Sequence, residues 1–367
     1  MENSDPELAE EWLDCKNILC IRADHMGDLL MSTPAIAALK STFGCKITVL
    51  TSAKAEDVAR LIPEIDHVIV ASLPWMKLKE DPEPAALQQL IAFIRDQHFD
   101  ACVIFNVYSQ NILPAAMMAY MAGIPLRLAY SRENPYHLLS HWLPDPEPYF
   151  YMVHQVERDL DLVRMIGATI KNKSLRLQLS PESMESAIVK GNLLGIDLNS
   201  PYIILHPGVS EDKRAYPEEL WISLGKLLVA QTGIRLLITG SADEQKLTAH
   251  ITAGIGPMAF SAAGAFTLEE FAAVISHAQT LVSVNTGTIH LAAAVHQPIV
   301  VLYAQTNPQH APWMVEHQLL EYSIPKVSQS RNQVIRFVNE YYYNHEVPIP
   351  SAIEVVEAVK KILDHQE

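Results

Sequence analysis

The feature that most constrains the fold is a regular alternation of short apolar runs with helical patterns. In the first half, the apolar runs NILCIRA, KITVLTS, HVIVASL and DACVIFNVY are separated by stretches with helical spacing. After a polar segment at residues 171–183, the alternation restarts with YIILHPG and continues through RLLITGS, TLVSVNTG and PIVVLYA. Parallel βαβ units produce this alternation, because each buried strand is followed by a helix that returns the chain to the start of the sheet. The sequence therefore predicts an α/β protein with two doubly wound, Rossmann-like parallel-sheet domains.

The length of 367 residues also favours two domains over one. We predict an N-terminal domain at 1–175, a C-terminal domain at 176–345 and a last helix within 346–367. This helix begins at SAIE, where Ser351 and Glu354 form a capping box, and we expect it to pack back towards the N-terminal domain. Ligands of open parallel sheets bind at the carboxyl ends of the strands. We therefore expect the two domains to face a central cleft, with the functional residues at strand ends.

Composition excludes several classes of function. The net charge of −15 argues against a nucleic-acid partner and weakens attraction to an anionic membrane, although it allows a local basic pocket. The first 16 residues are acidic and lack the apolar run of a signal peptide, and the apolar stretch Ile112–Leu126 is broken by proline and glycine, so we predict a buried helix there and a cytoplasmic protein. Four cysteines without CxxC spacing are predicted to be reduced core residues: Cys15, Cys20, Cys45 and Cys102.

The first candidate for chemistry lies in ILCIRADHMGDLLMSTPAIAALK. Gly27 and Asp28 stand where a buried strand turns directly into a helix. A carboxylate in a first helical turn can simply stabilise the helix dipole. Alternatively, Asp28 serves as a general base at the end of the first strand, and Gly27 lets a substrate approach the backbone closely. The residues alone leave both readings open.

A second candidate is the turn in SVNTGTIHLAAAV, where a strand ends in Asn285, Thr286, Gly287 and Thr288. Free amides at a helix N-terminus, together with two hydroxyls, suit an anionic group such as a diphosphate. An asparagine N-cap in an ordinary tight turn fits the same residues. His290 follows in the first turn of the helix and could face either a ligand or the core.

Two further strand ends carry charged side chains. In LHPGVSEDKRAYPEELW, a loop presents Ser210, Lys213 and Arg214, which are either solvated or placed to neutralise a departing nucleoside diphosphate. In ITGSADEQ, Glu244 follows Gly240 by four residues. Its carboxylate could accept hydrogen bonds from ribose hydroxyls, or it could be an ordinary first-turn glutamate.

Together these segments resemble glycosyltransferase family 9, the ADP-heptose:lipopolysaccharide heptosyltransferases, which have a GT-B fold. The resemblance runs from IRADHMGDLLMSTPAIAALK through HPGVSEDKRAYPEELW to SVNTGTIHLAAAVHQPIVVLYAQTNP and the last helix. It implies that Asp28 is the catalytic aspartate and that Arg214, where lysine is usual, contacts the donor phosphates. It also implies that Glu244 contacts the donor nucleoside and that residues 285–288 bind diphosphate and sugar, with His290 following.

The resemblance implies an inverting transfer of heptose from ADP-heptose to a hydroxyl of a lipopolysaccharide-type or other glycan or glycolipid acceptor. It implies no cofactor and no obligatory metal, with the donor on the C-terminal domain and the acceptor on the N-terminal domain. The enzyme would then be cytoplasmic, at most peripheral to the cytoplasmic face of the inner membrane. The candidates for the acceptor side are Gly27, Lys54, Arg60, Arg127 and Arg132.

Two departures from the family pattern bear on the donor sugar. The family commonly has aspartate where this chain has Asn285, and a Gly-Pro-Thr-Asp-Pro turn where this chain reads AQTNP from Ala304. Two alternatives therefore stay open. One is a glycosyltransferase acting on a soluble secondary metabolite, and the other is a GT-B protein that binds or epimerises a nucleotide sugar without transferring it.

Overall fold

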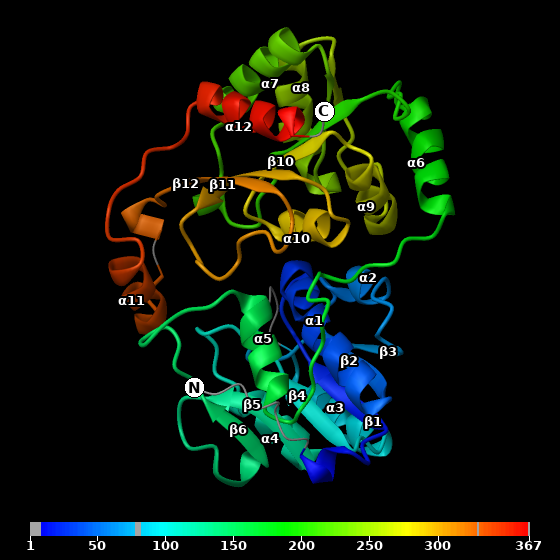
Figure 1. Cartoon of the computed structure of the whole chain (residues 1–367), viewed down its shortest axis with the longest axis vertical. Coiled ribbons are helices and arrows are strands. Elements are labelled where there is room, and N and C mark those ends of the chain that lie inside the picture. The colour runs from blue at the N-terminus through cyan, green and yellow to red at the C-terminus, as the bar shows by residue number, and fades with distance from the viewer. Residues whose placement is uncertain (1–8, 78–81, 329, 366–367) are drawn as a thin grey trace. The chain divides into compact units, whose positions relative to one another are not determined.

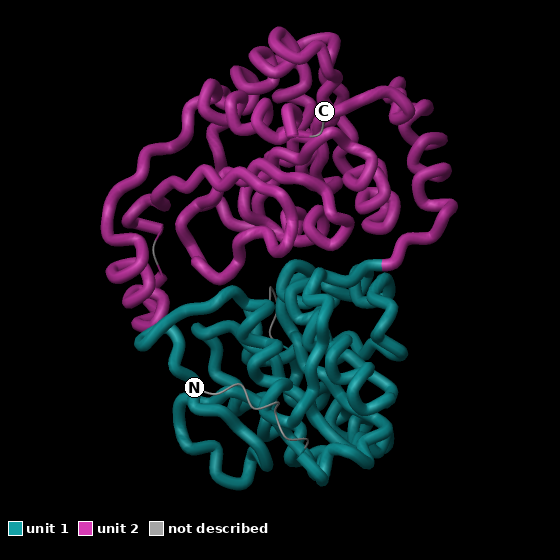
Figure 2. Tube along the Cα trace, in the orientation of Figure 1, with its two compact units in different colours: residues 1–177 teal, residues 178–367 magenta. Residues whose placement is uncertain are grey.

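The computed structural model describes residues 9–77, 82–328 and 330–365, so the first eight residues of the acidic N-terminal segment lie outside it. The chain forms two compact units, residues 1–177 and 178–367, which are coloured separately in Figure 2. This division lies two residues from the boundary predicted between residues 175 and 176. The predicted α/β fold with two doubly wound parallel sheets is confirmed, and each sheet has six strands.

All neighbouring strands of the first sheet are parallel, in the order β3-β2-β1-β4-β5-β6. The strands are β1 (Asn17–Ile21), β2 (Lys46–Thr51), β3 (His67–Val70), β4 (Ala101–Ile104), β5 (Leu126–Ser131) and β6 (His141–Pro144). The strand order reverses between β1 and β4, so the loops that follow these two strands diverge there. This topological switch point is where open α/β sheets bind ligands.

Helices cover both faces of the first sheet (Figure 1). They are α1 (Met26–Phe43), α2 (Glu56–Ala59), α3 (Pro84–Asp96), α4 (Leu113–Met121) and α5 (Gln155–Arg164), with short 3₁₀ turns η1 (Glu10–Trp12) and η2 (Tyr136–Leu138). Helices α3 and α4 share one apolar core with alternate residues of β1 and β4, while α1 packs against α5. Because both faces are buried, the central strands are continuously apolar instead of alternating.

The apolar stretch Ile112–Leu126 is not the single buried helix that we predicted. Helix α4 ends at Met121, Gly123 has a φ of +79°, and Leu126 already belongs to β5. A left-handed backbone at a glycine is a common way to end a helix, and Pro125 cannot continue one. Apolar runs of this length do not distinguish a helix from a helix followed by a buried strand.

The second sheet repeats the same parallel topology, in the order β12-β11-β10-β7-β8-β9. Its strands are β7 (Tyr202–His206), β8 (Arg235–Ile238), β9 (Ala259–Ser261), β10 (Thr280–Val284), β11 (Ile299–Ala304) and β12 (His317–Tyr322). The switch point of this sheet lies between β7 and β10. The two loops that carry the predicted donor residues Arg214 and Asn285 therefore leave neighbouring strands.

In the second unit, α7, α8 and α12 lie on one face of the sheet, and α9 and α10 lie on the other (Figure 1). The helices are α6 (Glu182–Leu193), α7 (Glu218–Thr232), α8 (Gln245–Ile255), α9 (Leu268–Ser276), α10 (Gly287–Ala294), α11 (Gln333–Tyr341) and α12 (Ala352–Asp364). Three 3₁₀ turns complete the described elements: η3 (Asp212–Arg214), η4 (Ala242–Glu244) and η5 (Lys326–Ser328).

Helix α12 belongs to the core of the second unit. Its predicted capping box is present, with the backbone N–H of Ser351 donating to Glu354 Oε2 over 2.7 Å. Its apolar stripe packs against α7 and strands β10 to β12 of the second unit, and its packing towards the N-terminal domain remains a prediction. Val355, Val359 and Ile362 are fully buried there. Each contributes about 1.5–3 kcal/mol to stability, which fixes the helix to this core.

The cysteine prediction is confirmed, because all four thiols are free and buried. Burial raises the pKa of Cys15 and of Cys45 to about 11, so both stay protonated at neutral pH. Among the described helices, none combines the length and the apolar composition that a bilayer span requires.

Candidate functional site

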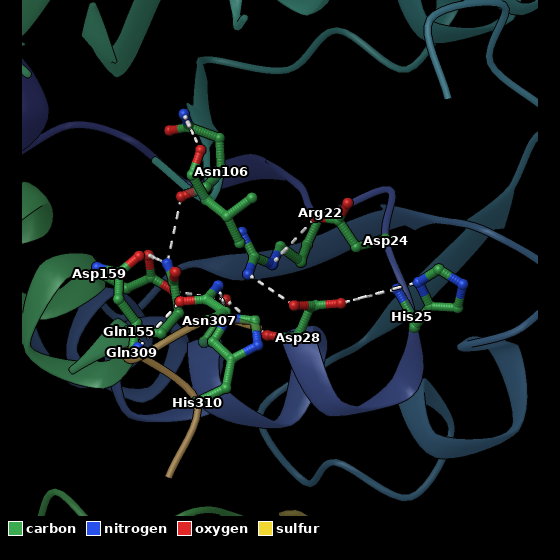
Figure 3. Close-up of polar contacts among 12 residues, drawn as sticks. Arg22, Asp24, His25, Asp28, Asn106, Gln155, Asp159, Asn307, Gln309 and His310 are labelled. Carbon is green, nitrogen blue, oxygen red and sulfur yellow. Dashed lines mark hydrogen bonds and ion pairs between the residues drawn. The ribbon is translucent and has the colours of Figure 1, made fainter. Parts of the chain in front are cut away.

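The first candidate site lies at the switch point of the first sheet, where residues 22–28 connect β1 to α1 (Figure 3). The Arg22 guanidinium is completely buried and forms two ion pairs, 3.5 Å from Asp28 Oδ1 and 3.5 Å from Asp24 Oδ2. The other oxygen of Asp28 accepts the backbone N–H of His25 over 3.2 Å. Asp28 therefore caps the helix and also belongs to a charged cluster, so a capping role and a role as general base are compatible. Its side chain is 15% exposed, which leaves it accessible to solvent.

Two further carboxylates surround the same guanidinium. Burial raises the pKa of Asp24, which accepts a hydrogen bond from Gln110 Nε2. Asp159 on α5 accepts hydrogen bonds from Ser32 Oγ over 2.6 Å and from Gln155 Nε2 over 2.8 Å, and burial raises its pKa to about 6. The charges of Asp24, Asp159 and Asp28 all act on Arg22. Arg22 is thus the cation shared by these three acidic groups, Arg158 adds to the positive charge at Asp159, and Asp28 is more exposed than Asp24.

Beside this cluster is a cavity of about 260 Å³ between the loops that follow β1 and β4. Its polar lining consists of Asp24, Asn106, Ser109, Gln110 and Asn111, and its apolar lining includes Trp75, Met76 and Ile104. Asn106 is 5% exposed, and its Oδ1 atom has no hydrogen-bond partner within the described ranges. A buried amide oxygen without a protein partner is commonly satisfied by an ordered water or by a ligand group.

The basic residues predicted for the acceptor side do not line this cavity. Arg127 lies at the amino end of β5, at the opposite edge of the sheet, and donates to the backbone carbonyls of His137 and Leu138. An acceptor-side role for it remains a prediction. Arg60 is an exposed partner of Glu56 at 2.7 Å.

The other acceptor-side candidates of the first unit are Lys54, Arg132 and Gly27. Lys54 Nζ is 3.3 Å from His25 Nε2, and Arg132 donates to the carbonyls of Tyr108 and Glu147. Gly27 is buried in the first turn of α1. An acceptor-side role for Gly27 and Arg60 remains a prediction.

At the switch point of the second sheet, His206 joins three elements. Its Nδ1 lies 2.9 Å from Thr239 Oγ1 after β8, its Nε2 lies 3.1 Å from Thr288 Oγ1 in α10, and its ring stacks on Phe271 of α9. Burial lowers the pKa of His206 to about 4, so the imidazole is neutral at physiological pH. Although HPG was recognised as a strand end, His206 was not predicted as a site residue. The sequence signal that could have indicated His206 is a histidine at the end of an apolar strand.

The N-terminus of α10 offers groups suited to an anion. Thr286 is the N-cap, and its buried hydroxyl has no hydrogen-bond partner in the part of the chain that the structure describes. The guanidinium of Arg214 donates from Nη1 to the backbone carbonyl of Asn285 over 3.0 Å, so the structure brings this predicted cation to the predicted turn. Lys213 and Arg214 share one carboxylate, with Glu211 Oε2 at 3.3 Å and 3.1 Å. The turn thus combines helix amides, an unpaired hydroxyl and two cations.

The side chain of Asn285 has a different role from the one that the sequence predicts. Its Nδ2 donates to the carbonyl of Ala304 over 3.0 Å and to Thr306 Oγ1 over 3.1 Å, and its Oδ1 accepts the N–H of Ala304 over 3.1 Å. These three bonds tie the end of β10 to the end of β11. The amide side chain is therefore committed to the fold, and a role of Asn285 in binding the donor remains a prediction.

Three other residues were predicted to bind the donor: Glu244, Ser210 and His290. Glu244 accepts the backbone N–H of Ser241 over 2.7 Å, and its carboxylate lies so close to Gly208 that a Cβ atom there would overlap it. Ser210 is exposed on the loop after β7. His290 is 4% exposed, and its ring meets that of His310 edge-on at 6.1 Å, which is a buried position against the loop after β11.

In the described ranges, no three His, Cys, Asp or Glu side chains cluster in a way that could hold a metal ion. Independence from metal ions remains a prediction about the reaction.

Comparisons with known proteins agree with this geometry. The sequence model of glycosyltransferase family 9 (heptosyltransferase) matches residues 87–336. Lipopolysaccharide heptosyltransferase 3 of Escherichia coli is 24% identical over 348 residues, 92% of this chain and 96% of that protein. A glycosyl transferase family 9 structure from Veillonella parvula DSM 2008 superposes with a TM-score of 0.78 at 18% identity, covering 98% of this chain and 100% of that one. The ADP-heptose lps heptosyltransferase II of E. coli superposes with a TM-score of 0.71 at 20% identity, covering 95% and 99%.

Proposed function

Since the chain belongs to glycosyltransferase family 9 and is therefore a glycosyltransferase, we propose that it transfers heptose from ADP-heptose, with inversion, to a hydroxyl of a lipopolysaccharide-type or other glycan acceptor. The names of its E. coli relatives support this choice of donor and acceptor. In this proposal the second unit binds the donor, the first unit binds the acceptor, and Asp28 is the general base.

The observation that carries the proposal is the turn at the N-terminus of α10. The buried hydroxyl of Thr286 has no partner among the described residues, and Arg214 is bonded to the same turn through the carbonyl of Asn285. Helix N-termini bind phosphates because their amides are unpaired and the helix dipole is positive at that end. A diphosphate at this turn would also lie at the switch point of the sheet, where dinucleotides bind in related folds. The carboxylate of Glu244, which follows β8 on the other side of β7, is suited to ribose hydroxyls.

In the first unit, Asp28 has the properties that a general base requires. Arg22 and the N–H of His25 keep its carboxylate oriented, while its partial exposure leaves an approach for a hydroxyl group. Asp28 would take the proton of the acceptor hydroxyl as that oxygen bonds to the anomeric carbon. The bond between the anomeric carbon and the β-phosphate oxygen then breaks, and ADP leaves with its electron pair.

The leaving diphosphate gains negative charge in the transition state. Arg214 and Lys213 would offset that charge together with the amides of α10, which is why we predict that the reaction needs no metal ion. A lipopolysaccharide acceptor would also require the enzyme to work at the cytoplasmic surface of the inner membrane. Flotation of the protein with acidic lipid vesicles tests that association.

The decisive experiment is Asp28→Asn. We expect transfer to fall by about 10²–10⁴-fold, because the amide cannot accept the proton, whereas ADP affinity should stay the same. The assay follows products by mass spectrometry, with ADP-heptose and with UDP-sugars as donors and heptose-deficient lipopolysaccharide as acceptor. Asp57→Asn is the matched control, because Asp57 is also a first-turn carboxylate, in α2.

Each other outcome of this assay identifies a different function. Unchanged transfer by Asp28→Asn would eliminate the proposed base. Nucleotide binding without consumption of any donor would indicate a non-transferring protein. Glycosylation of soluble acceptors alone would indicate a transferase of a soluble metabolite.

A further inference from the structure

We propose that the cavity between the loops after β1 and β4 binds an uncharged, polyhydroxylated ring of the acceptor, and that Asp24 makes it reject an anionic ring. This inference rests on the proposed transferase function and specifies the chemical class of its acceptor. It concerns the 260 Å³ cavity alone, whose walls all belong to the first unit.

The polar wall of the cavity is suited to hydroxyl groups. It offers one carboxylate, three amide side chains and one hydroxyl, from Asp24, Asn106, Gln110, Asn111 and Ser109, and no described lysine, arginine or histidine lines it. The buried Oδ1 of Asn106 has no partner in the described ranges, so it can accept a hydrogen bond from a ligand donor or from water. A sugar hydroxyl donates such a bond. A carboxylate or a phosphate oxygen cannot, because both are acceptors.

The apolar wall and the size of the cavity suit a single ring. Trp75, Met76, Ile112 and Pro114 provide surfaces on which the C–H face of a sugar can pack, as aromatic and apolar side chains do in ligand pockets. The cavity volume is below the roughly 300–1,000 Å³ that is typical of pockets for drug-sized ligands. One ring therefore fits the cavity better than an oligosaccharide does.

The charge around the cavity disfavours an anion. Arg22 is the cation that compensates Asp24, and its charge is shared with Asp28 and Asp159. Arg158 also acts on Asp159, but this second guanidinium is itself paired with Asp145 and Glu147. The carboxylates therefore outnumber the guanidinium groups, and negative charge is in excess beside the cavity. An anionic ring would add a like charge in a partly buried setting, where charge–charge interactions are stronger than in water. A neutral ring avoids that repulsion and can donate hydroxyl protons to Asp24.

The location of Asp24 connects the cavity to the proposed base. Asp24 precedes Asp28 by four residues, and Arg22 pairs with both carboxylates. A ring held against Asp24 would therefore present its hydroxyls to the cluster that contains Asp28. This gives Asp24, in the loop before α1, a role distinct from that of Asp28, which caps the helix from its first turn.

The test is saturation-transfer NMR on the full-length protein, with matched pairs of sugars. The members of each pair differ only at C6, where a neutral hydroxymethyl group is replaced by a carboxylate: the methyl glycosides of glucose, galactose and mannose against the methyl glycosides of the corresponding uronic acids. We expect at least one neutral glycoside to bind, and its uronate to bind about tenfold more weakly or worse, because of the added like charge. In Asp24→Asn, the preference for the neutral member should shrink to about threefold or less.

Two further variants locate the binding. Ser109→Trp places a large side chain at the partly exposed rim and should abolish the signal from the neutral glycosides, and a melting scan checks that this variant folds. Asp57→Asn removes an exposed carboxylate that does not line the cavity and should leave the preference unchanged.

Uronates that bind as well as their neutral partners, binding that survives Ser109→Trp, or the absence of signal from every glycoside would overturn the inference. Consumption of ADP-heptose, measured separately, distinguishes the two proposals. Transfer with no preference for neutral rings refutes only the acceptor class. A preference that depends on Asp24, in a protein that consumes no donor, refutes only the transferase.

Discussion

The side chain of Asn285 provides a quantitative test of how the second unit is held together. Asn285 is 6% exposed, and its Nδ2 donates to the carbonyl of Ala304 while its Oδ1 accepts the N–H of the same residue. Asn285→Asp keeps the size of the side chain but replaces the Nδ2 donor with an acceptor. The Ala304 carbonyl then loses this partner and faces a carboxylate oxygen.

The expected cost follows from these contacts. Loss of the hydrogen bond costs about 1 kcal/mol, and a buried acceptor without that partner costs about 1–3 kcal/mol more. The free energy of unfolding of the second unit should therefore fall by about 2–4 kcal/mol at pH 7.5. For a unit of this size, that loss corresponds to a decrease in Tm of roughly 5–15 °C.

The loss should also depend on pH. A protonated carboxylic acid can again donate to the carbonyl of Ala304, so the fold favours the protonated form and raises the pKa of the carboxyl introduced by Asn285→Asp above the unfolded value of about 3.9. With a raised folded-state pKa, the destabilisation is largest above that pKa and shrinks as the pH falls through it. Melting of the variant and of the wild type at pH 7.5 and pH 5.0 measures this change.

The exposed substitution Asn344→Asp is the control, and it should change Tm little at either pH. If Asn285→Asp melts like the wild type, or if its loss of stability is the same at both pH values, the assigned hydrogen-bond role of Asn285 is refuted.

Two further predictions concern donor binding and are measured by titration calorimetry with ADP. Gly208→Ala should displace the carboxylate of Glu244, because the new Cβ would overlap it. ADP affinity should then fall by about tenfold, with little change in Tm. Unchanged affinity would exclude Glu244 from the nucleotide site. Glu211→Gln should strengthen ADP binding by about two- to fivefold, because the carboxylate that competes for Lys213 and Arg214 is removed. Weaker or equal binding by Glu211→Gln would show that those cations do not meet the diphosphate.

Much of the fold could be predicted from the sequence, because βαβ units produce recognisable patterns among residues that are close along the chain. Buried parallel strands are continuously apolar, helices carry their own caps, and the boundary between the units lies in a polar segment. The elements that we did not predict have weaker local signals: β5 and β6 lie beside or within a proline-rich region, β9 has three residues, and β12, α6 and α11 are partly exposed.

The position of the candidate residues in the fold could be predicted better than the contacts that each side chain makes. Candidate residues at strand ends can be expected to lie together, because parallel topology brings the carboxyl ends of strands to one edge whatever the side chains are. Arg214 was predicted beside the turn at Asn285, and the structure has them bonded. Arg127 belongs to β5, which the sequence did not predict, and lies at the other edge of the sheet.

The sequence by itself determined the two parallel sheets, the strand ends that matter and the family, since each depends on patterns between residues close along the chain. Only the tertiary structure decided which partner each polar side chain has. Arg22 meets Asp159 from a helix more than a hundred residues away, and the amide of Asn285 is used by the end of the neighbouring strand. A hydrogen bond or an ion pair acts over a few ångströms in space, so separation along the chain carries almost no information about it.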